Sequence, residues 1–277
     1  MTRFRRIVRD LGGLAFVVGL LLLVYLLPPD TSLSEVRQVR TLRVCVPTAY
    51  PPLVTGDPDM PGIDVELLTA VAERIGVRLL VGTNDAMGRD FNPRHWGVTR
   101  ASCQVLAGGV VASSLTRSFL DTGPAYVETG WAVVAPEPLA DLSGLTIGAL
   151  NAISGLDRIA LASYLRREGV AVRVVARAEA LVEGIAEGEL DGGVTEALLA
   201  SQLATANGWS LAFLPDELGR YDVVFGLWKG DLTLKRAIDR AFAALERDGT
   251  LAAILERYGV SPIGAGAVPA LSGLIPR

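Results

Sequence analysis

The chain has 277 residues, with 26 basic and 30 acidic side chains and a net charge of −4. Its first forty residues hold six arginines and three acids, so the remainder carries 20 basic and 27 acidic residues. The resulting net charge of −7 argues against nucleic acid as a partner, and two cysteines with one histidine are too few for a zinc site unless carboxylates supply the missing ligands.

The N-terminal segment is typical of an exported protein. Its parts are Arg3, Arg5, Arg6 and Arg9, then an apolar run over Leu11–Leu27, then Pro28 and Pro29. As a helix the run would rise about 26 Å, enough for a thin bilayer core, and the arginines place the N-terminus in the cytoplasm. Because no small-x-small cleavage pattern follows closely, we expect residues 1–30 to be an uncleaved anchor with one transmembrane helix rather than a cleaved signal.

Beyond a polar linker at 31–41, helical and strand-type spacing alternate, as in a sheet with helices on its faces. The first set is predicted as strands at 42–46, 77–81 and 104–111, with helices at 64–75 and 93–102. The second set is predicted as strands at 130–134, 145–149, 170–175, 192–195 and 211–214, with helices at 156–168, 178–187 and 196–207. A strand at 221–228 and helices at 233–247 and 250–258 precede a loose tail at 263–277.

Two α/β sets of this size predict two lobes. We expect lobe 1 to hold residues 42–131 and 226–262, because the last strand and helices are in excess for the second set. Lobe 2 would hold residues 132–225, and the chain would cross between the lobes near 132–135 and near 221–225. Two crossings make a hinge, and the cleft between lobes is the expected ligand site.

Five segments in order give the chain a likeness to a known family: LRVCVPTAYPP (42–52), GIDVELL (62–68), AERIGV (72–77), GELDGGVTE (188–196) and DGTLAAILERYG (248–259). Over residues 41–260 it resembles the bacterial family 3 extracellular solute-binding proteins, the polar amino-acid type of periplasmic binding protein. Cys103–Gly109 is also similar to a branch found near quinoprotein dehydrogenase genes.

The resemblance implies a fold and a setting. The fold would be α/β of the two-lobed periplasmic-binding-protein type II, each lobe a mostly parallel sheet flanked by helices. The protein would be a monomer without a cofactor, metal or catalytic residues, on the periplasmic side of the inner membrane. Its partners would be a small-molecule ligand, an amino acid or organic acid, and the permease complex of an ABC-type transporter.

Arg117 is the first candidate for ligand binding. Ser113 or Ser114 can cap a helix there, and a helix N-terminus with a guanidinium makes a carboxylate receptor. In the family an arginine in this loop holds the ligand's α-carboxylate, although the spacing here differs by about one residue and Thr-Arg replaces Glu-Arg. The alternative is a surface arginine in the first turn of a helix.

Three further residues complete the predicted ligand site. Glu196 ends a strand where the family usually has an aspartate for the ligand's ammonium group; its alternative role is a helix N-cap. Tyr50 stands where the family covers the ligand with an aromatic ring, which can also contact an ammonium group; alternatively it packs on its own lobe. Ser154 could offer its hydroxyl to the ligand's carboxylate or merely cap a helix.

The remaining candidates are structural. Cys45 and Cys103 fall on the first and third strands of an expected 2-1-3 order, so we predict a disulfide, with two buried thiols as the alternative. Asp64 and Asp191 are expected to cap backbone N–H groups at helix and strand ends, and Trp96 and His95 to pack or lie at the surface.

Capture of a solute is the function we expect. A different class is an enzyme similar to the cyclohexadienyl dehydratases, with Glu196 as its acid or base. A third is an accessory or sensory module for a periplasmic dehydrogenase. Fold alone cannot separate these classes.

Overall fold

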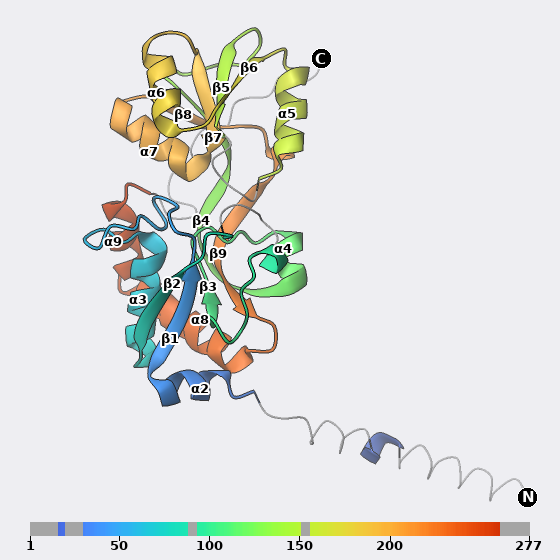
Figure 1. Ribbon diagram of the computed structural model, residues 1–277, viewed down its shortest axis with the longest axis vertical. Coiled ribbons are helices and arrows are strands. Elements are labelled where there is room, and N and C mark those ends of the chain that lie inside the picture. Colours follow the sequence, from blue (N-terminus) through green and yellow to red (C-terminus); the bar gives the residue numbers. More distant parts are fainter. Residues whose placement is uncertain (1–15, 20–29, 88–92, 151–155, 261–277) are drawn as a thin grey trace, which may run out of the picture.

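The computed structural model describes residues 16–19, 30–87, 93–150 and 156–260. They form an α/β structure of two lobes, one above the other in Figure 1, joined through the long strands β4 and β9. The strand order is β2-β1-β3-β9-β4-β7-β5-β6, and β8 pairs with β4 beside this path. The order confirms the predicted 2-1-3 arrangement of the first three strands.

Lobe 1, the lower lobe in Figure 1, contains the strands nearest the N-terminus and the last helices. Its elements are α2 (Ser32–Val39), β1 (Thr41–Val46), α3 (Ile63–Ile75), β2 (Arg78–Thr83), β3 (Val105–Leu106), α4 (Ser114–Phe119), α8 (Leu232–Arg247) and α9 (Thr250–Arg257). Helix α8 packs against α2, α3 and α9. Its apolar positions recur at helical spacing, and the buried ones include Leu234, Ile238, Phe242 and Leu245.

Lobe 2 contains the middle of the chain. Its elements are β5 (Thr146–Leu150), α5 (Arg158–Arg167), β6 (Ala171–Val175), α6 (Ala178–Ala186), β7 (Gly192–Glu196), α7 (Ala197–Asn207) and β8 (Ser210–Phe213). Strands β6 and β7 flank β5 in parallel register. The apolar residues divide into clusters on the two faces of this sheet, one including Ile147 and Leu165 and the other Leu181 and Ala200.

Strands β4 (Leu120–Ala135) and β9 (Arg220–Trp228) connect the lobes. β4 pairs antiparallel with β9 from Leu120 to Gly130, and then with β7 and β8 from Trp131 onward. β9 in turn pairs antiparallel with β3 of lobe 1. The last strand therefore returns to the first lobe, as expected, whereas the lobe boundaries at 131/132 and 225/226 stay a prediction.

The sheet corrects one expectation. The predicted mostly parallel sheets are mixed, since β4 and β9 run antiparallel to their neighbours. The reason is topological: a strand that leaves one lobe and a strand that returns to it run in opposite directions. Among the described strands, parallel pairing is confined to β1 with β2 and β3, and to β5 with β6 and β7.

Two local predictions were wrong. The expected linker at 31–41 contains helix α2. It is held in place because Asp30 accepts from the Thr233 N–H and Ser32 from the Leu234 N–H at the start of α8, and because Val36 is fully buried. The expected helix at 93–102 is a single 3-10 turn at Pro93–His95. A second turn follows there, in which Ser102 Oγ and the Cys103 N–H both donate to the Thr99 carbonyl.

The expected strand at 104–111 shortens to the two residues of β3. Gly108 and Gly109 have φ of 85° and 93°, a backbone conformation that interrupts a strand and suits glycine. Beside β3 the predicted disulfide is confirmed: Cys45 and Cys103 are bonded, with their Cα atoms 5.7 Å apart. Both cysteines are buried with Trp96 and Met87, so the bond fastens the β1–β3 edge of lobe 1.

Some predictions lie outside the described residues. These are the loose tail at 263–277, Ser154, and the anchor except for 16–19. Within the residues that the structure describes, no helix is both long and apolar enough to cross a membrane.

Candidate ligand-binding site at the lobe junction

Tyr50 is held in a tight turn at the end of lobe 1 that faces lobe 2. Its N–H donates to the Val54 carbonyl over 2.6 Å, and the Val54 N–H donates back over 2.9 Å. The ring lies on Gly109: a Cβ atom at that glycine would be 2.6 Å from Tyr50 Cε1. Glycine is therefore required at position 109 for the ring to lie where it does, and Tyr50 is only 7% exposed.

Asp64 holds three segments of lobe 1 together. It is fully buried in the first turn of α3, where its Oδ1 accepts from the Tyr126 hydroxyl and its Oδ2 accepts from the Gly108 N–H over 2.5 Å. Burial raises the pKa of Asp64 to about 6, although the same hydrogen bonds lower it. Asp64 thus binds a backbone N–H, as predicted, but that N–H belongs to Gly108 in a distant loop and not to its own helix, whose N-cap is Gly62.

Tyr126 reaches Asp64 from strand β4. Its ring stacks on Phe225 of β9 with centroids 5.1 Å apart, and Phe242 of α8 lies against both. The hydroxyl is buried, and the negative charge of Asp64 adds to burial in raising the pKa of Tyr126 well above its usual value. Tyr126 is therefore a neutral donor fixed by an aromatic cluster.

Glu196 is the corresponding buried acid of lobe 2. It ends β7 and begins α7, its Oε1 accepts from Thr129 Oγ1 of β4, and its Oε2 accepts from the Leu199 N–H over 3.2 Å. The alternative role as helix N-cap is thus present, and the ligand role stays a prediction. Glu196 is only 1% exposed, and this burial raises its pKa to about 7.

Both buried acids act on Tyr50 through their charge. Burial is the main cause that raises the pKa of Tyr50 well above its usual value, and the negative charges of Glu196 and Asp64 raise it further. Leu198, in the first turn of α7, belongs to the same buried cluster as Tyr50. Leu198 therefore packs the first turn of α7 on lobe 1, and the charges of one buried acid from each lobe act on Tyr50.

Arg117 lies in a different part of the predicted site. Ser113 is the N-cap of α4 and accepts from the Thr116 N–H over 3.1 Å, whereas Ser114 is exposed. Arg117 is exposed in the last turn of this short helix rather than its first. Among the described residues, no hydrogen bond or ion pair joins its guanidinium to Tyr50 or Glu196. Figure 1 places α4 beside β4, near the level at which the lobes meet.

Sequence reasoning missed Tyr126 and Thr129 and assigned Asp64 only a local role. Asp64 could have been suspected, because an acid in the second position of an amphipathic helix beside two apolar residues has no solvent-facing place. Nothing in the sequence of β4 signals Tyr126 or Thr129, whose partners come from 62 and 67 residues away. The remaining acid, Asp191, does accept from a backbone N–H, that of Thr146.

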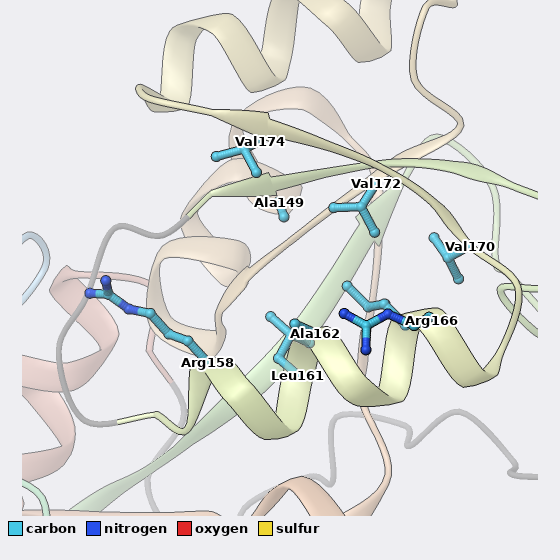
Figure 2. Close-up of a pocket in the computed structure, with 9 residues that line it drawn as sticks. Ala149, Arg158, Leu161, Ala162, Arg166, Val170, Val172 and Val174 are labelled. Atoms are coloured by element: carbon cyan, nitrogen blue, oxygen red, sulfur yellow. The ribbon is translucent and has the colours of Figure 1, made fainter.

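A separate cavity of about 390 Å³ lies within lobe 2, between α5 and the strands β5 and β6 (Figure 2). Apolar side chains such as Leu161 and Val172 line it, and Arg158 and Arg166 stand at its two ends. None of the predicted site residues that the structure describes lines this cavity. One of its lining residues, Val174, is exposed on β6, the edge strand of the sheet.

Comparison with known proteins supports this architecture. The L-cystine-binding protein TcyJ of Escherichia coli strain K12 is 24% identical over 242 residues, covering 82% of this chain and 85% of that protein. An ancestral cationic amino acid solute binding protein superposes with a TM-score of 0.67 at 16% identity, covering 82% of this chain and 99% of the other. A polar amino acid ABC uptake transporter substrate binding protein from Streptococcus thermophilus superposes with a TM-score of 0.66 at 17% identity. The match covers 83% of this chain and 89% of the other.

The solved structures share the fold of this chain. The family is shown by a sequence match that covers nearly all of the two lobes. The model of the bacterial extracellular solute-binding proteins, family 3, matches residues 42–261. The likeness to the quinoprotein dehydrogenase branch stays a prediction. The two lobes, the paired β4 and β9 and the matched sequence together make this chain a member of the bacterial extracellular solute-binding proteins, family 3.

Proposed function

We propose that this protein captures an amino acid or a closely related small acid between its two lobes and delivers it to an ABC-type permease. The observation that carries the proposal is the buried ring of Tyr50, on which the negative charges of Asp64 of lobe 1 and Glu196 of lobe 2 both act. Two buried acids without a cationic partner among the described residues favour a ligand with an ammonium group, because a positive charge there offsets the cost of burying a carboxylate.

The proposed contacts divide between the lobes. Tyr50 covers the ammonium group, Glu196 pairs with it, and Arg117 with the N-terminus of α4 receives the carboxylate. Ser154 contributes its hydroxyl from lobe 2. A ligand that contacts both lobes stabilises the closed state by those differential contacts.

We also propose that residues 1–30 anchor the body on the periplasmic side of the inner membrane as a monomer. The support is the arginine-flanked apolar run of the sequence. A family match to extracellular solute-binding proteins agrees with a body outside the cytoplasm.

The test is calorimetric titration of the full chain in detergent against amino acids and organic acids. For any ligand that binds, Arg117→Ala should weaken affinity about 30-fold or more, the equivalent of about 2 kcal/mol. Arg74→Ala is the matched control, because Arg74 is another exposed arginine of lobe 1, and its partner is Asp248. Unchanged affinity in Arg117→Ala would place the carboxylate receptor elsewhere.

A second candidate function is a dehydratase acting on a prephenate-like acid. The observation that favours it is Glu196, since a carboxyl group with a pKa of about 7 suits general acid or base catalysis near neutral pH. Incubation with such an acid separates the two functions. Release of water and CO₂ would indicate an enzyme, and recovery of intact ligand a carrier.

A further inference from the structure

A second pocket lies at the base of lobe 1, at the end farthest from lobe 2, where Figure 1 shows α2. Its volume is about 370 Å³. Four segments meet there: α2, β1, the turn before β3, and the start of α8. The pocket, called here the basal pocket, is lined by Ser32, Glu35, Arg43, Arg100, Ala101, Gln104 and Asp231.

One side of the basal pocket offers hydrogen-bond donors with positive charge. The buried Gln104 accepts at Oε1 from the Arg43 backbone N–H over 2.8 Å and from Arg43 Nε over 3.4 Å. Its amide N–H groups have no partner among the described residues. Arg100 adds a second guanidinium, half exposed, whose NH2 group lies 2.8 Å from Asp231 Oδ1. Two guanidinium groups and an amide are donors suited to a phosphate.

The other side offers an unsatisfied acceptor. Asp231 is 2% exposed; its Oδ1 is paired with Arg100, but its Oδ2 is buried without a hydrogen bond in the described structure. A buried carboxylate oxygen in this state is costly, and an ammonium N–H would satisfy it. Glu35 of α2 also lines the pocket, so negative charge gathers on this side.

The N-terminal junction places the basal pocket close to the proposed membrane. Asp30 Oδ1 accepts from the Ser32 N–H, and its Oδ2 accepts from the Thr233 N–H. Ser32 Oγ accepts from the Leu234 N–H over 3.2 Å. These bonds fix α2 on α8 and leave only residues 28–31 between the apolar run and Ser32. Even fully extended, the chain from Leu27 to Ser32 spans at most about 18 Å.

We propose that the basal pocket binds a zwitterionic phosphate ester with a primary ammonium group, as found in an aminoethyl phospholipid headgroup or in a free phosphate ester. The phosphate binds Arg43, Arg100 and Gln104, and the ammonium group donates to Asp231 Oδ2. The inference that the ester is a lipid depends on the membrane anchor of the proposed function. The inference that the basal pocket binds such an ester does not depend on that anchor. Binding there would hold lobe 1 flat against the membrane surface.

The first experiment titrates the full chain in neutral detergent with glycerophosphoethanolamine, inorganic phosphate and ethanolamine by calorimetry. The ester should bind at least tenfold more tightly than either fragment. Arg43→Gln should weaken the ester about tenfold, and Asp231→Asn should lower its affinity to that of phosphate. Arg74→Gln, which alters an arginine elsewhere on lobe 1, should change nothing. Absence of saturable ester binding, equal binding of phosphate, or full binding in Arg43→Gln would overturn the proposal.

A second experiment identifies the source and keeps the two proposals apart. Hydrogen exchange of α2 and residues 100–104 is compared in bilayer discs with ethanolamine or choline headgroups, since a quaternary ammonium cannot donate to Asp231. If α2 and residues 100–104 exchange more slowly in ethanolamine discs than in choline discs, the pocket binds a lipid headgroup of the membrane. If the exchange is equal in both kinds of disc and the soluble ester still binds, the natural ligand is a free ester. Arg117→Ala should leave ester binding intact whether or not it abolishes amino-acid binding at the lobe junction.

Discussion

Glu196 joins structural and electrostatic roles in one residue. As the N-cap of α7 it satisfies a backbone N–H at the start of a helix, where the helix dipole favours its negative charge. Burial acts in the opposite direction and prevails, because the pKa of Glu196 rises to about 7. In the unliganded protein near neutral pH the group is therefore poised between its two forms.

This balance predicts how stability depends on pH. Between pH 4.5 and 7 the folded protein keeps a proton on Glu196 that the unfolded chain has released, so the free energy of unfolding falls as pH rises through this window. Glu196→Gln should make the decline from pH 5 to pH 8 smaller by on the order of 2 kcal/mol, measured by urea denaturation. Glu189→Gln, an exposed acid of the same lobe, is the control. An unchanged decline in Glu196→Gln would contradict the assignment.

Gly109 predicts a binding defect that acts through Tyr50. In Gly109→Ala the new Cβ meets the Tyr50 ring at 2.6 Å, and the positive φ adds backbone strain. We expect a loss of about 2 kcal/mol in the free energy of unfolding and weaker ligand binding. Gly76→Ala is a matched control, because it has a φ of 84° with open space around it. Equal losses of binding in the two variants would mean that the ring position does not matter.

At the scale of elements, the disulfide fastens a very short strand of lobe 1. β3 has only two residues, and its pairing with β1 extends over Val44 and Cys45. Of the described residues between β2 and β3, those of Pro93–His95 form a 3-10 turn. The bond from Cys45 to Cys103 therefore supplies a constraint that the short ladder cannot.

Removing the disulfide should be costly. The bonded cysteines are 58 residues apart, and the chain-entropy relation gives about 4 kcal/mol for a loop of that size. The variant with both cysteines replaced by alanine should lose stability on this scale in urea denaturation, without losing the two-lobed fold. Reducing agent should destabilise the native chain and leave the double variant unchanged. A loss below about 1 kcal/mol would show that the unfolded chain is already restricted.

At the scale of the whole molecule, β4 and β9 form the only connections between the lobes in the described structure. A two-strand connection permits hinge closure, and contacts across the junction decide which state is populated. Leu198 is such a contact, since this residue of lobe 2 is buried in the cluster of lobe 1. Its neighbour Leu199 packs instead against a cluster of lobe 2.

Leu198→Ala should therefore shift the unliganded protein toward an open state. We expect a larger radius of gyration by small-angle X-ray scattering and a weaker ligand affinity, because closure then lacks one apolar contact. Excess ligand should restore the compact form. Leu199→Ala should leave the radius unchanged, and a change in both variants would indicate a general loosening of α7 rather than an effect on closure.

Particular residues show how far the sequence alone could predict the site. Tyr50 and Glu196 were placed at loop and strand ends from local patterns; the structure buries both, and their role in ligand binding stays a prediction. Asp64 was read as a cap because its helix position is local information, whereas its partners Gly108 and Tyr126 are set by the packing of β4 on α3. Arg117 shows that a local pattern can locate a loop without locating a side chain in it. Its loop was recognised, but its place in the last turn of α4 was not.

The sequence by itself determined the alternation of helices and strands, the 2-1-3 order with its disulfide, and the return of the last strand to lobe 1. These follow from hydrophobic periodicity, turn residues and chain connectivity, which act over a few residues at a time. Only the tertiary structure decided the mixed sheet, the helix at residues 32–39 and the buried acids at the lobe junction. These features depend on contacts between residues far apart in the chain. Once water is excluded, the free energy of those contacts exceeds the conformational preference of the local sequence.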